Sequence, residues 1–258
     1  MSPLDLSPAP GAAPLHRMVG AHALLEIRLL LRNGEQVVLA VALPLLVLVA
    51  GVQSGGLVDL GAGRRVDVLT PGVLALAVVS TSFTSLAIAT GFERRYGVLK
   101  RLGATPLPRS GLLCGKALAL VGVEALQVVL IGAVALLLGW HPSGGVAAVL
   151  GGALALLLGT ACFAALGLAL AGSMRAETTL AVANLVYVLL LLGGGVVVPL
   201  ARYPDGVQPF VEALPSGALA QSVREVAAGA GVPLLPVAVL VAWTVAGAVL
   251  AARTFRWE

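Results

Sequence analysis

The chain has 258 residues, of which 59% are hydrophobic and 11% charged, and its formal net charge is +4. Soluble domains average about 25% charged residues. Here a mean hydropathy of +1.02 spreads apolar residues over the whole length, so the composition excludes a soluble globular domain. The basic residues lie in short segments between apolar runs, which membrane topology explains more simply than nucleic-acid binding does. We therefore expect no nucleic-acid partner.

The apolar residues recur in blocks of about 20 residues, the length at which an α-helix crosses a bilayer. The alternation typical of β-strands is missing from these blocks. They predict an all-α polytopic membrane protein with six spans, at about 36–52, 68–90, 111–138, 146–171, 180–198 and 232–251. Residues 1–14 contain four prolines and predict a disordered tail. The rest, 15–258, is then one transmembrane domain.

Residues 15–33 predict an amphipathic helix ahead of the first span. At 100° per residue one narrow sector holds four charged side chains, and leucines cover most of the remainder. These four are Arg17, Arg28, Arg32 and Glu35. This pattern favours an interfacial helix lying among the lipid headgroups. The alternative is a plain cytosolic extension of the first span.

The distribution of lysine and arginine predicts the orientation. With both termini on one side, that side holds twelve of these residues and the opposite side holds four. Because basic residues are enriched in cytoplasmic loops, we expect a multi-pass protein of the cytoplasmic membrane with both termini in the cytoplasm.

The segment between spans two and three predicts a short amphipathic helix close to the membrane. Its apolar residues recur at roughly helical spacing on one side, and basic residues fill much of the rest. The apolar set is Phe92, Tyr96, Leu99 and Leu102, and the basic set is Arg94, Arg95, Lys100 and Arg101. Such a helix either rests on anionic headgroups or fits a groove on a partner protein.

Glu124 is the clearest ionisable residue within a span. It lies eight residues beyond Lys116, roughly 12 Å deeper along a helix, and Gln127 shares its face. A carboxyl group at that depth costs several kcal/mol unless it is protonated or paired. Glu124 is therefore either a substrate or proton contact, or a protonated structural hydrogen-bonding group. The same two interpretations apply to further polar residues of the predicted pathway, Ser82, Ser85, Asn184 and Tyr187.

Residues 93–109 read ERRYGVLKRLGATPLPR, and this run resembles the cytoplasmic loop of ABC-2 type transporter permeases. The shared features are an acidic and basic pair, a glycine, a hydrophobic-basic run and a Thr-Pro end. The segment 193–199, followed by several prolines and Arg224, resembles the family's segment between spans five and six. The resemblance extends over nearly all of 15–258, and the drug-exporting, daunorubicin-resistance-like branch looks most similar.

The resemblance implies a permease that dimerises, with itself or with a related permease, and docks a separate ATPase subunit. The ATPase-coupling helix would comprise Phe92, Glu93, Arg94, Arg95, Tyr96, Leu99, Lys100, Arg101 and Leu102. Glu93 and Arg94 would contact the ATPase or the interfacial helix, where Arg28 or Arg32 could pair with Glu93. The apolar side chains of Tyr96, Leu99 and Leu102 would fill the groove of the ATPase. The resemblance also implies an external re-entrant helical segment before the last span.

The chain itself lacks a phosphate-binding loop, since the nearest glycine-lysine run, 111–117, is one residue short and has no hydroxyl residue after the lysine. ATP and magnesium would then belong to the partner, and this chain would hold no cofactor and no metal. We expect an exporter subunit that moves a small amphipathic or hydrophobic compound, such as a drug, lipid or secondary metabolite, within membrane lipid. The alternative is a proton-coupled secondary carrier that uses Glu124.

An intramembrane enzyme is disfavoured. The three histidines lie outside the predicted spans, and Glu124 has no acidic partner at its depth. We therefore predict no catalytic residue.

Overall fold

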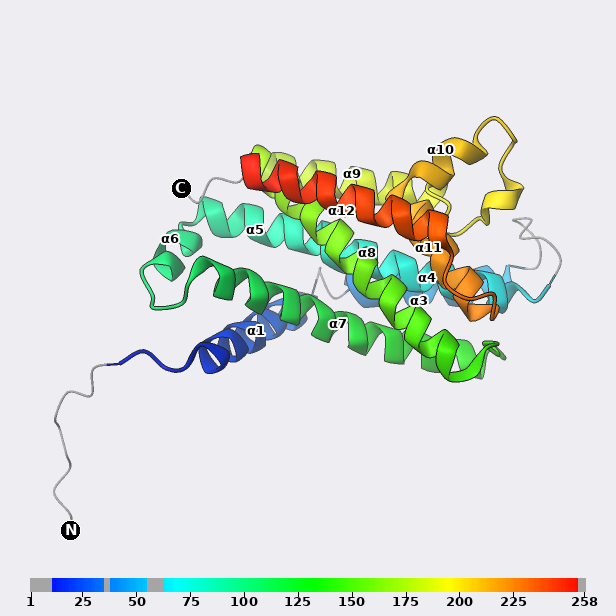
Figure 1. Ribbon diagram of the computed structural model, residues 1–258, viewed down its shortest axis with the longest axis horizontal. Coiled ribbons are helices and arrows are strands. Elements are labelled where there is room, and N and C mark those ends of the chain that lie inside the picture. The colour runs from blue at the N-terminus through cyan, green and yellow to red at the C-terminus, as the bar shows by residue number, and fades with distance from the viewer. Residues whose placement is uncertain (1–10, 35–37, 55–62, 255–258) are drawn as a thin grey trace, which may run out of the picture.

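A computed structural model describes residues 11–34, 38–54 and 63–254. Within these ranges all the regular structure is helical (Figure 1), which confirms the all-α fold class. The elements are α1 (Leu15–Arg32), η1 (Val38–Ala42), α3 (Leu43–Gln53), α4 (Arg65–Val78), η2 (Val79–Ser85), α5 (Leu86–Arg95), α6 (Val98–Gly103), α7 (Arg109–Leu137), α8 (Gly145–Ser173), α9 (Ala176–Gly193), η3 (Leu200–Arg202), α10 (Gln208–Ala213), α11 (Pro215–Ala227) and α12 (Leu234–Thr254).

In the described part of the chain, five helices are long and apolar enough to cross a membrane. They are the continuous helix Arg65–Arg95, formed by α4, η2 and α5, together with α7, α8, α9 and α12. These correspond to predicted spans two to six. Predicted span one corresponds to the shorter apolar helix Ala40–Gln53, and its first residues lie outside the described ranges, so the sixth span stays a prediction.

The predicted end of span five, at residue 198, is wrong. The helix α9 stops at Gly193 and an irregular segment, 194–199, follows. Three consecutive glycines favour this end, because Gly195 adopts a left-handed φ of 74° that other residues rarely take. Pro199 then prevents the helix from resuming along the same axis.

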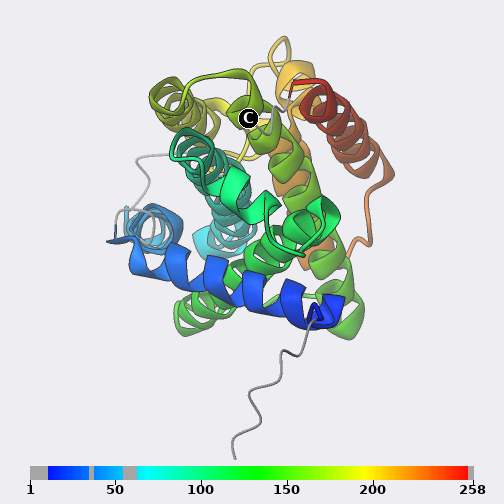
Figure 2. The ribbon, with the colours of Figure 1, turned by 90° about the vertical axis from the view of Figure 1, so that its left-hand side faces the viewer.

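The helix Arg65–Arg95 lies at the centre of the bundle, and the other helices surround it (Figure 2). Its most apolar window is 89% buried, against 17–39% for the other four candidate spans. Phe83 of η2 packs edge-to-face on Phe163 of α8, with ring centroids 6.4 Å apart. Gly167 allows this approach, because a Cβ atom there would lie 3.0 Å from the Phe83 carbonyl oxygen. Close packing of this kind drives helix association in membranes.

The helix α1 lies across one side of the bundle (Figure 2) and packs on α7. His22 faces Gly115 and Ile27 faces Gly122, where added Cβ atoms would come within 2.5 Å and 3.1 Å of these side chains. Its inward face carries buried His22, Ala23 and Glu26, while its outward face carries exposed leucines. Whether α1 lies among headgroups stays a prediction.

Some of the sequence predictions concern residues beyond the described ranges. Glu35 of the predicted charged sector lies outside them, and so does the predicted tail except for residues 11–14.

The bundle has two ends, which we name by their short helices. The α6 end holds α6, the start of α7 and the last turn of α12, and the α10 end holds α10 and η3 (Figure 1).

Candidate functional site

Four ionisable side chains from three helices meet where α1 crosses the bundle near the α6 end. The Lys116 ammonium of α7 donates to Glu26 Oε1 of α1 at 2.9 Å and to Glu93 Oε1 of α5 at 2.7 Å. The His22 Nε2 atom lies 3.4 Å from the same Glu26 oxygen. We call these four residues the junction cluster. One lysine thus links α1, α5 and α7.

The junction cluster is shielded from solvent, since its side chains are 5% to 16% exposed. Burial lowers the pKa of His22; the Glu26 carboxylate opposes this effect and the Lys116 ammonium reinforces it. A neutral His22 leaves one ammonium between two carboxylates, or one net negative charge. Buried charges are costly once separated from their partners, so the three helices are expected to move together at this point.

The predicted single coupling helix from Phe92 to Leu102 is wrong. The helix α5 continues to Arg95, the chain turns at Tyr96 and Gly97, and α6 follows. Gly97 has a left-handed φ of 68°, and its amide donates to the Arg94 carbonyl oxygen, which is a common way for a helix to end. The coupling residues therefore lie on two short helical pieces joined by a glycine turn.

The turn presents a basic and aromatic surface. Tyr96 is 63% exposed and stacks on Phe92 with ring centroids 6.0 Å apart, while the Arg95 guanidinium lies over its ring. Lys100 and Arg101 of α6 are also exposed. We call Arg95, Tyr96, Lys100 and Arg101 the docking segment.

Two arginines tie the end of α5 to the connection between α8 and α9. Arg94 donates to the carbonyl oxygens of Gly172 at 2.7 Å and Met174 at 2.8 Å, so it satisfies backbone groups that the end of α8 leaves free. Arg95 forms an ion pair with Glu177 of α9. The docking segment is therefore connected to α8 and α9 through Arg94 and Arg95, and to α1 and α7 through Glu93.

A layer of polar side chains crosses the middle of the bundle. Glu124 of α7 is 5% exposed and its two carboxyl oxygens meet the hydroxyl groups of Ser82 of η2 and Thr160 of α8. One turn further, Gln127 accepts from Thr81 Oγ1 at 3.1 Å and donates to the carbonyl oxygen of Ala40 in η1 at 2.5 Å. We call Thr81, Ser82, Glu124, Gln127 and Thr160 the polar layer.

The π-helical turns next to the polar layer are an informative local feature. Both η1 and η2 are π-helices, and such segments occur frequently at functional sites. Ser85 of η2 lines a small pocket together with Thr81. Tyr187 of α9 is buried beside Ser80 of η2, and Asn184 is half-buried one turn earlier. The structure thus joins Glu124 to Ser82 and Gln127 to the adjacent Thr81, and Ser85 lies in the same π-helix as Thr81 and Ser82.

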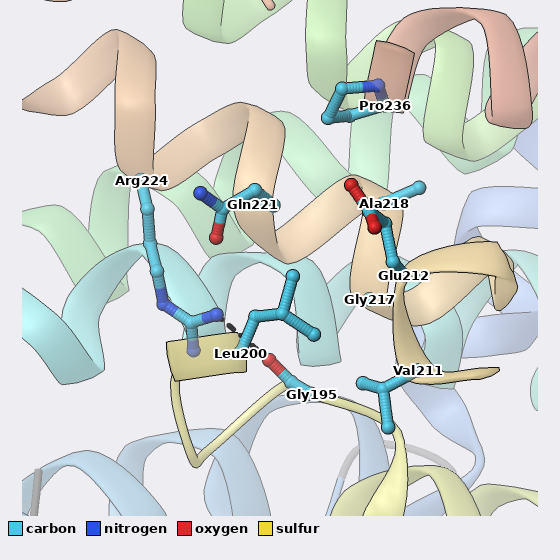
Figure 3. Close-up of a pocket in the computed structure, with 9 residues that line it drawn as sticks. All are labelled: Gly195, Leu200, Val211, Glu212, Gly217, Ala218, Gln221, Arg224 and Pro236. Carbon is cyan, nitrogen blue, oxygen red and sulfur yellow. Dashed lines mark hydrogen bonds between the residues drawn. The ribbon is translucent and has the colours of Figure 1, made fainter. Parts of the chain in front are cut away.

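The α10 end is held by a half-buried arginine on α11 (Figure 3). Arg224 donates to the carbonyl oxygens of Gly195 at 2.8 Å and of Val196, which lie in the irregular segment after α9. Burial lowers the pKa of Arg224 to about 10, so it stays charged at neutral pH. Gly72 of α4 makes room for this contact, because a Cβ atom there would lie 1.9 Å from the Val196 oxygen. The carbonyl oxygens of Gly195 and Val196, which make no helical hydrogen bond after α9 ends, thus find a donor within the protein, as a membrane environment requires.

The ABC-2 type transporter family model matches residues 25–227. The chain belongs to the ABC-2 type transporter family. A comparison with curated proteins finds no match. The resemblance inferred from residues 93–109 is therefore confirmed, while the daunorubicin-resistance-like branch stays a prediction. The matched region of this ABC-2 permease includes the docking segment, the polar layer, Arg224 and all of the junction cluster except His22.

The suggested pair between Glu93 and Arg28 or Arg32 of the permease is wrong. Both arginines are exposed, and Glu93 pairs with Lys116 instead. The reason is helical geometry. Arg28 is two residues beyond Glu26, so at 100° per residue it points about 200° away from the side of α1 that faces α7.

The prediction that Leu99 reaches into a partner's groove is also wrong, because Leu99 is 5% exposed and buried within the permease itself. Tyr96 is exposed and Leu102 is half-exposed, so these two remain available.

Glu26, Lys116 and Thr160 of the permease were missed as site residues. A signal existed for Glu26, since His22 lies four residues earlier and hence on the same face of a largely apolar helix. Nothing in the sequence distinguished Lys116 from the other basic residues of the side predicted to be cytoplasmic.

Proposed function

We propose that this permease is the membrane subunit of an ATP-driven exporter in the plasma membrane, with its α6 end in the cytoplasm. A separate ATPase subunit, which holds ATP and magnesium, would dock on the docking segment. The observation that carries the proposal is the direct connection of the exposed docking segment to the junction cluster. Glu93 and Arg94 lie immediately before Arg95 and Tyr96. Glu93 contacts Lys116 of α7, which also binds α1, and Arg94 contacts the end of α8 and the α8–α9 connection.

This connection supports a route for transmitting movement. ATP binding closes the ATPase and displaces the docking segment. Lys116 carries the displacement to α7, which also holds Glu124, and Arg94 carries it to α8, which holds Thr160. Movement of α7 relative to α8 and η2 would separate Glu124 from Ser82 and Thr160 and open a pathway for the cargo.

The cargo would be a small amphipathic compound. The polar layer supplies hydroxyl, amide and carboxyl groups, and the helices around it are apolar. A second permease copy or a related permease would cover part of the outer surface, for which α9 and α12 are suited because their most apolar windows are only 22% and 17% buried. Lipid would cover the remainder.

The test is transport into inside-out membrane vesicles prepared with and without the chain, using a lipophilic rhodamine dye as probe. The exporter predicts uptake that requires hydrolysable ATP and persists when a protonophore dissipates the proton gradient. The proton-coupled carrier predicts uptake without ATP that the protonophore abolishes. A variant carrying Tyr96→Asp and Arg101→Glu in the docking segment should lose uptake, whereas Arg253→Glu, exposed at the same end, should retain it. Uptake that is independent of ATP would overturn the proposal.

A further inference from the structure

Glu124 lies midway along the candidate membrane span α7 without an ion-pair partner. It is the sixteenth of the 29 residues of α7 and is 5% exposed. Within 11–34, 38–54 and 63–254, the ion pairs involve other carboxylates, and Glu124 has only hydroxyl partners. Lys116 lies eight residues away, roughly 12 Å along the helix, and is occupied by Glu26 and Glu93.

Within the described residues, the elements packed against α7 form no ion pair with Glu124. On α1, His22 and Glu26 lie in the junction cluster, whereas Arg28 and Arg32 are exposed. On α4, Arg65 and Asp67 lie at the first turn. The sequences of α3, η2 and α8 contain no charged residue. Glu124 must therefore either carry a proton or meet a cation that comes from outside the chain.

The hydrogen bonds fit a protonated carboxyl group in the present, closed arrangement. The Thr160 hydroxyl lies 2.8 Å from the carbonyl oxygen of Leu156 and has a single proton, which it donates to that oxygen. The short contact between Thr160 Oγ1 and Glu124 Oε2 is then made by the proton of Glu124. Ser82 donates to the other oxygen, Oε1. Every polar atom of the uncharged acid is thus satisfied.

We propose that Glu124 recognises a positively charged group of the cargo, so that the cargo class is a lipophilic cation, such as a protonated amine. This inference rests on the proposed function and specifies its substrate. When the cation arrives, the O–H bond of Glu124 breaks, the proton leaves to water, and an ion pair forms between the carboxylate and the cation. Thr160 then turns its hydroxyl from Leu156 to Oε2, so that both hydroxyl groups stabilise the carboxylate.

The surroundings of Glu124 combine polar and apolar groups, as recognition of an amphipathic cation requires. A small pocket borders the polar layer between the end of α1, η1, η2 and α7, and it combines the Thr81 and Ser85 hydroxyl groups with apolar side chains. Val123, the neighbour of Glu124, is one of these apolar residues, and Leu30 of α1 is another. An anionic cargo would meet the carboxylate without a counter-charge, which a low-dielectric site penalises strongly.

The experiment measures binding of two probes of the same shape to the purified full chain in detergent. Tetraphenylphosphonium is a permanent lipophilic cation, and tetraphenylborate is the matching anion. Equilibrium dialysis against protein-free micelles removes the contribution of detergent. We expect E124Q to bind the cation at least about tenfold more weakly than the wild type, since a bond to a charged group is worth about that much. Binding of the anion should be the same in both.

E124Q is a suitable variant because its amide can accept from Ser82 and donate to Thr160, as the protonated acid does. E124D retains the charge and should retain preference for the cation. A measurement on the wild type alone adds a test that no misfolded variant can obscure. In weak buffer, the bound cation should release about one proton by linkage, and the anion should release none.

Equal binding of the cation by wild type and E124Q would overturn the inference, and so would cation binding without proton release. Because the assay contains no ATPase, these outcomes are distinct from failure of the exporter itself. Equal cation binding by wild type and E124Q, with ATP-driven uptake of the cationic dye intact, would leave an exporter that recognises its cargo elsewhere than at Glu124. Cation binding at Glu124 without any ATP-driven uptake would instead refute the exporter on which the inference rests.

Discussion

Replacing Lys116 with methionine tests the junction cluster most severely. The substitution keeps much of the side-chain volume and removes the ammonium that lies 2.9 Å from Glu26 Oε1 and 2.7 Å from Glu93 Oε1. Two carboxylates then remain in a buried site without a cation. Removing one partner of a buried ion pair costs about 3–5 kcal/mol. Because the Glu93 side chain is 16% exposed and can gain water or a proton, we expect a value near the lower limit, about 3 kcal/mol.

Thermal unfolding of the detergent-purified chain measures this cost. In a chain of this size 1 kcal/mol shifts Tm by about 2–4 °C, so K116M should unfold about 6–12 °C below the wild type. The triple variant K116M/E26Q/E93Q should recover most of the loss, because neutral groups of similar volume often replace a buried ion cluster at little cost. If K116M unfolded at the wild-type temperature, or if the triple variant were no more stable than K116M, the reasoning about the cluster would be refuted.

Three further substitutions test other parts of the structure by thermal unfolding. Leu99→Asp should lower Tm because it places a charge at a buried position, while Lys100→Asp on the exposed side of α6 should not. Gly72→Ala should cost about 1–3 kcal/mol, because the added Cβ atom would overlap the Val196 carbonyl oxygen. Its control is Gly132→Ala, where nothing lies within 4 Å of the added atom. Equal effects of the two substitutions would contradict the close approach of Gly72 to Val196. The pKa of His22 is lowered in the folded chain, so the unfolded chain protonates His22 more readily. Stability should therefore fall as pH drops below about 6.5, and it should fall less in H22N. An identical pH response of the wild type and H22N would contradict the lowered pKa of His22.

The helices that the sequence predicted well are those with strong local signals. Long apolar blocks identified five spans by length alone. The external helical segment that the resemblance implied corresponds to α10 and α11, and a bare loop of that length would be unusual. Its depth in the outer leaflet stays a prediction. The turn at Gly97 was also a local signal, because a glycine after a helical run commonly ends the helix, and the regular spacing of apolar residues across it concealed the break.

The junction cluster could not be predicted in the same way. It depends on which side of α1 faces α7, and this is set by the fit of His22 onto Gly115 and of Ile27 onto Gly122. These contacts join residues that are distant in the sequence, so helical periodicity within either segment does not reveal them. The partner of Glu124 posed the same difficulty. Thr160 on α8 is 36 residues away, whereas the sequence suggested only Gln127 or a neighbouring span.

The central claim is that a separate ATPase docks on the α6 end of this permease. Its most direct test is purification of the tagged chain from native membranes in mild detergent, followed by identification of the proteins that remain bound. We predict that an ATP-binding cassette subunit accompanies the wild type and the R253E control and is lost from the docking-segment variant with Tyr96→Asp and Arg101→Glu. If no such subunit accompanies the wild type under conditions that preserve other membrane complexes, the claim is contradicted.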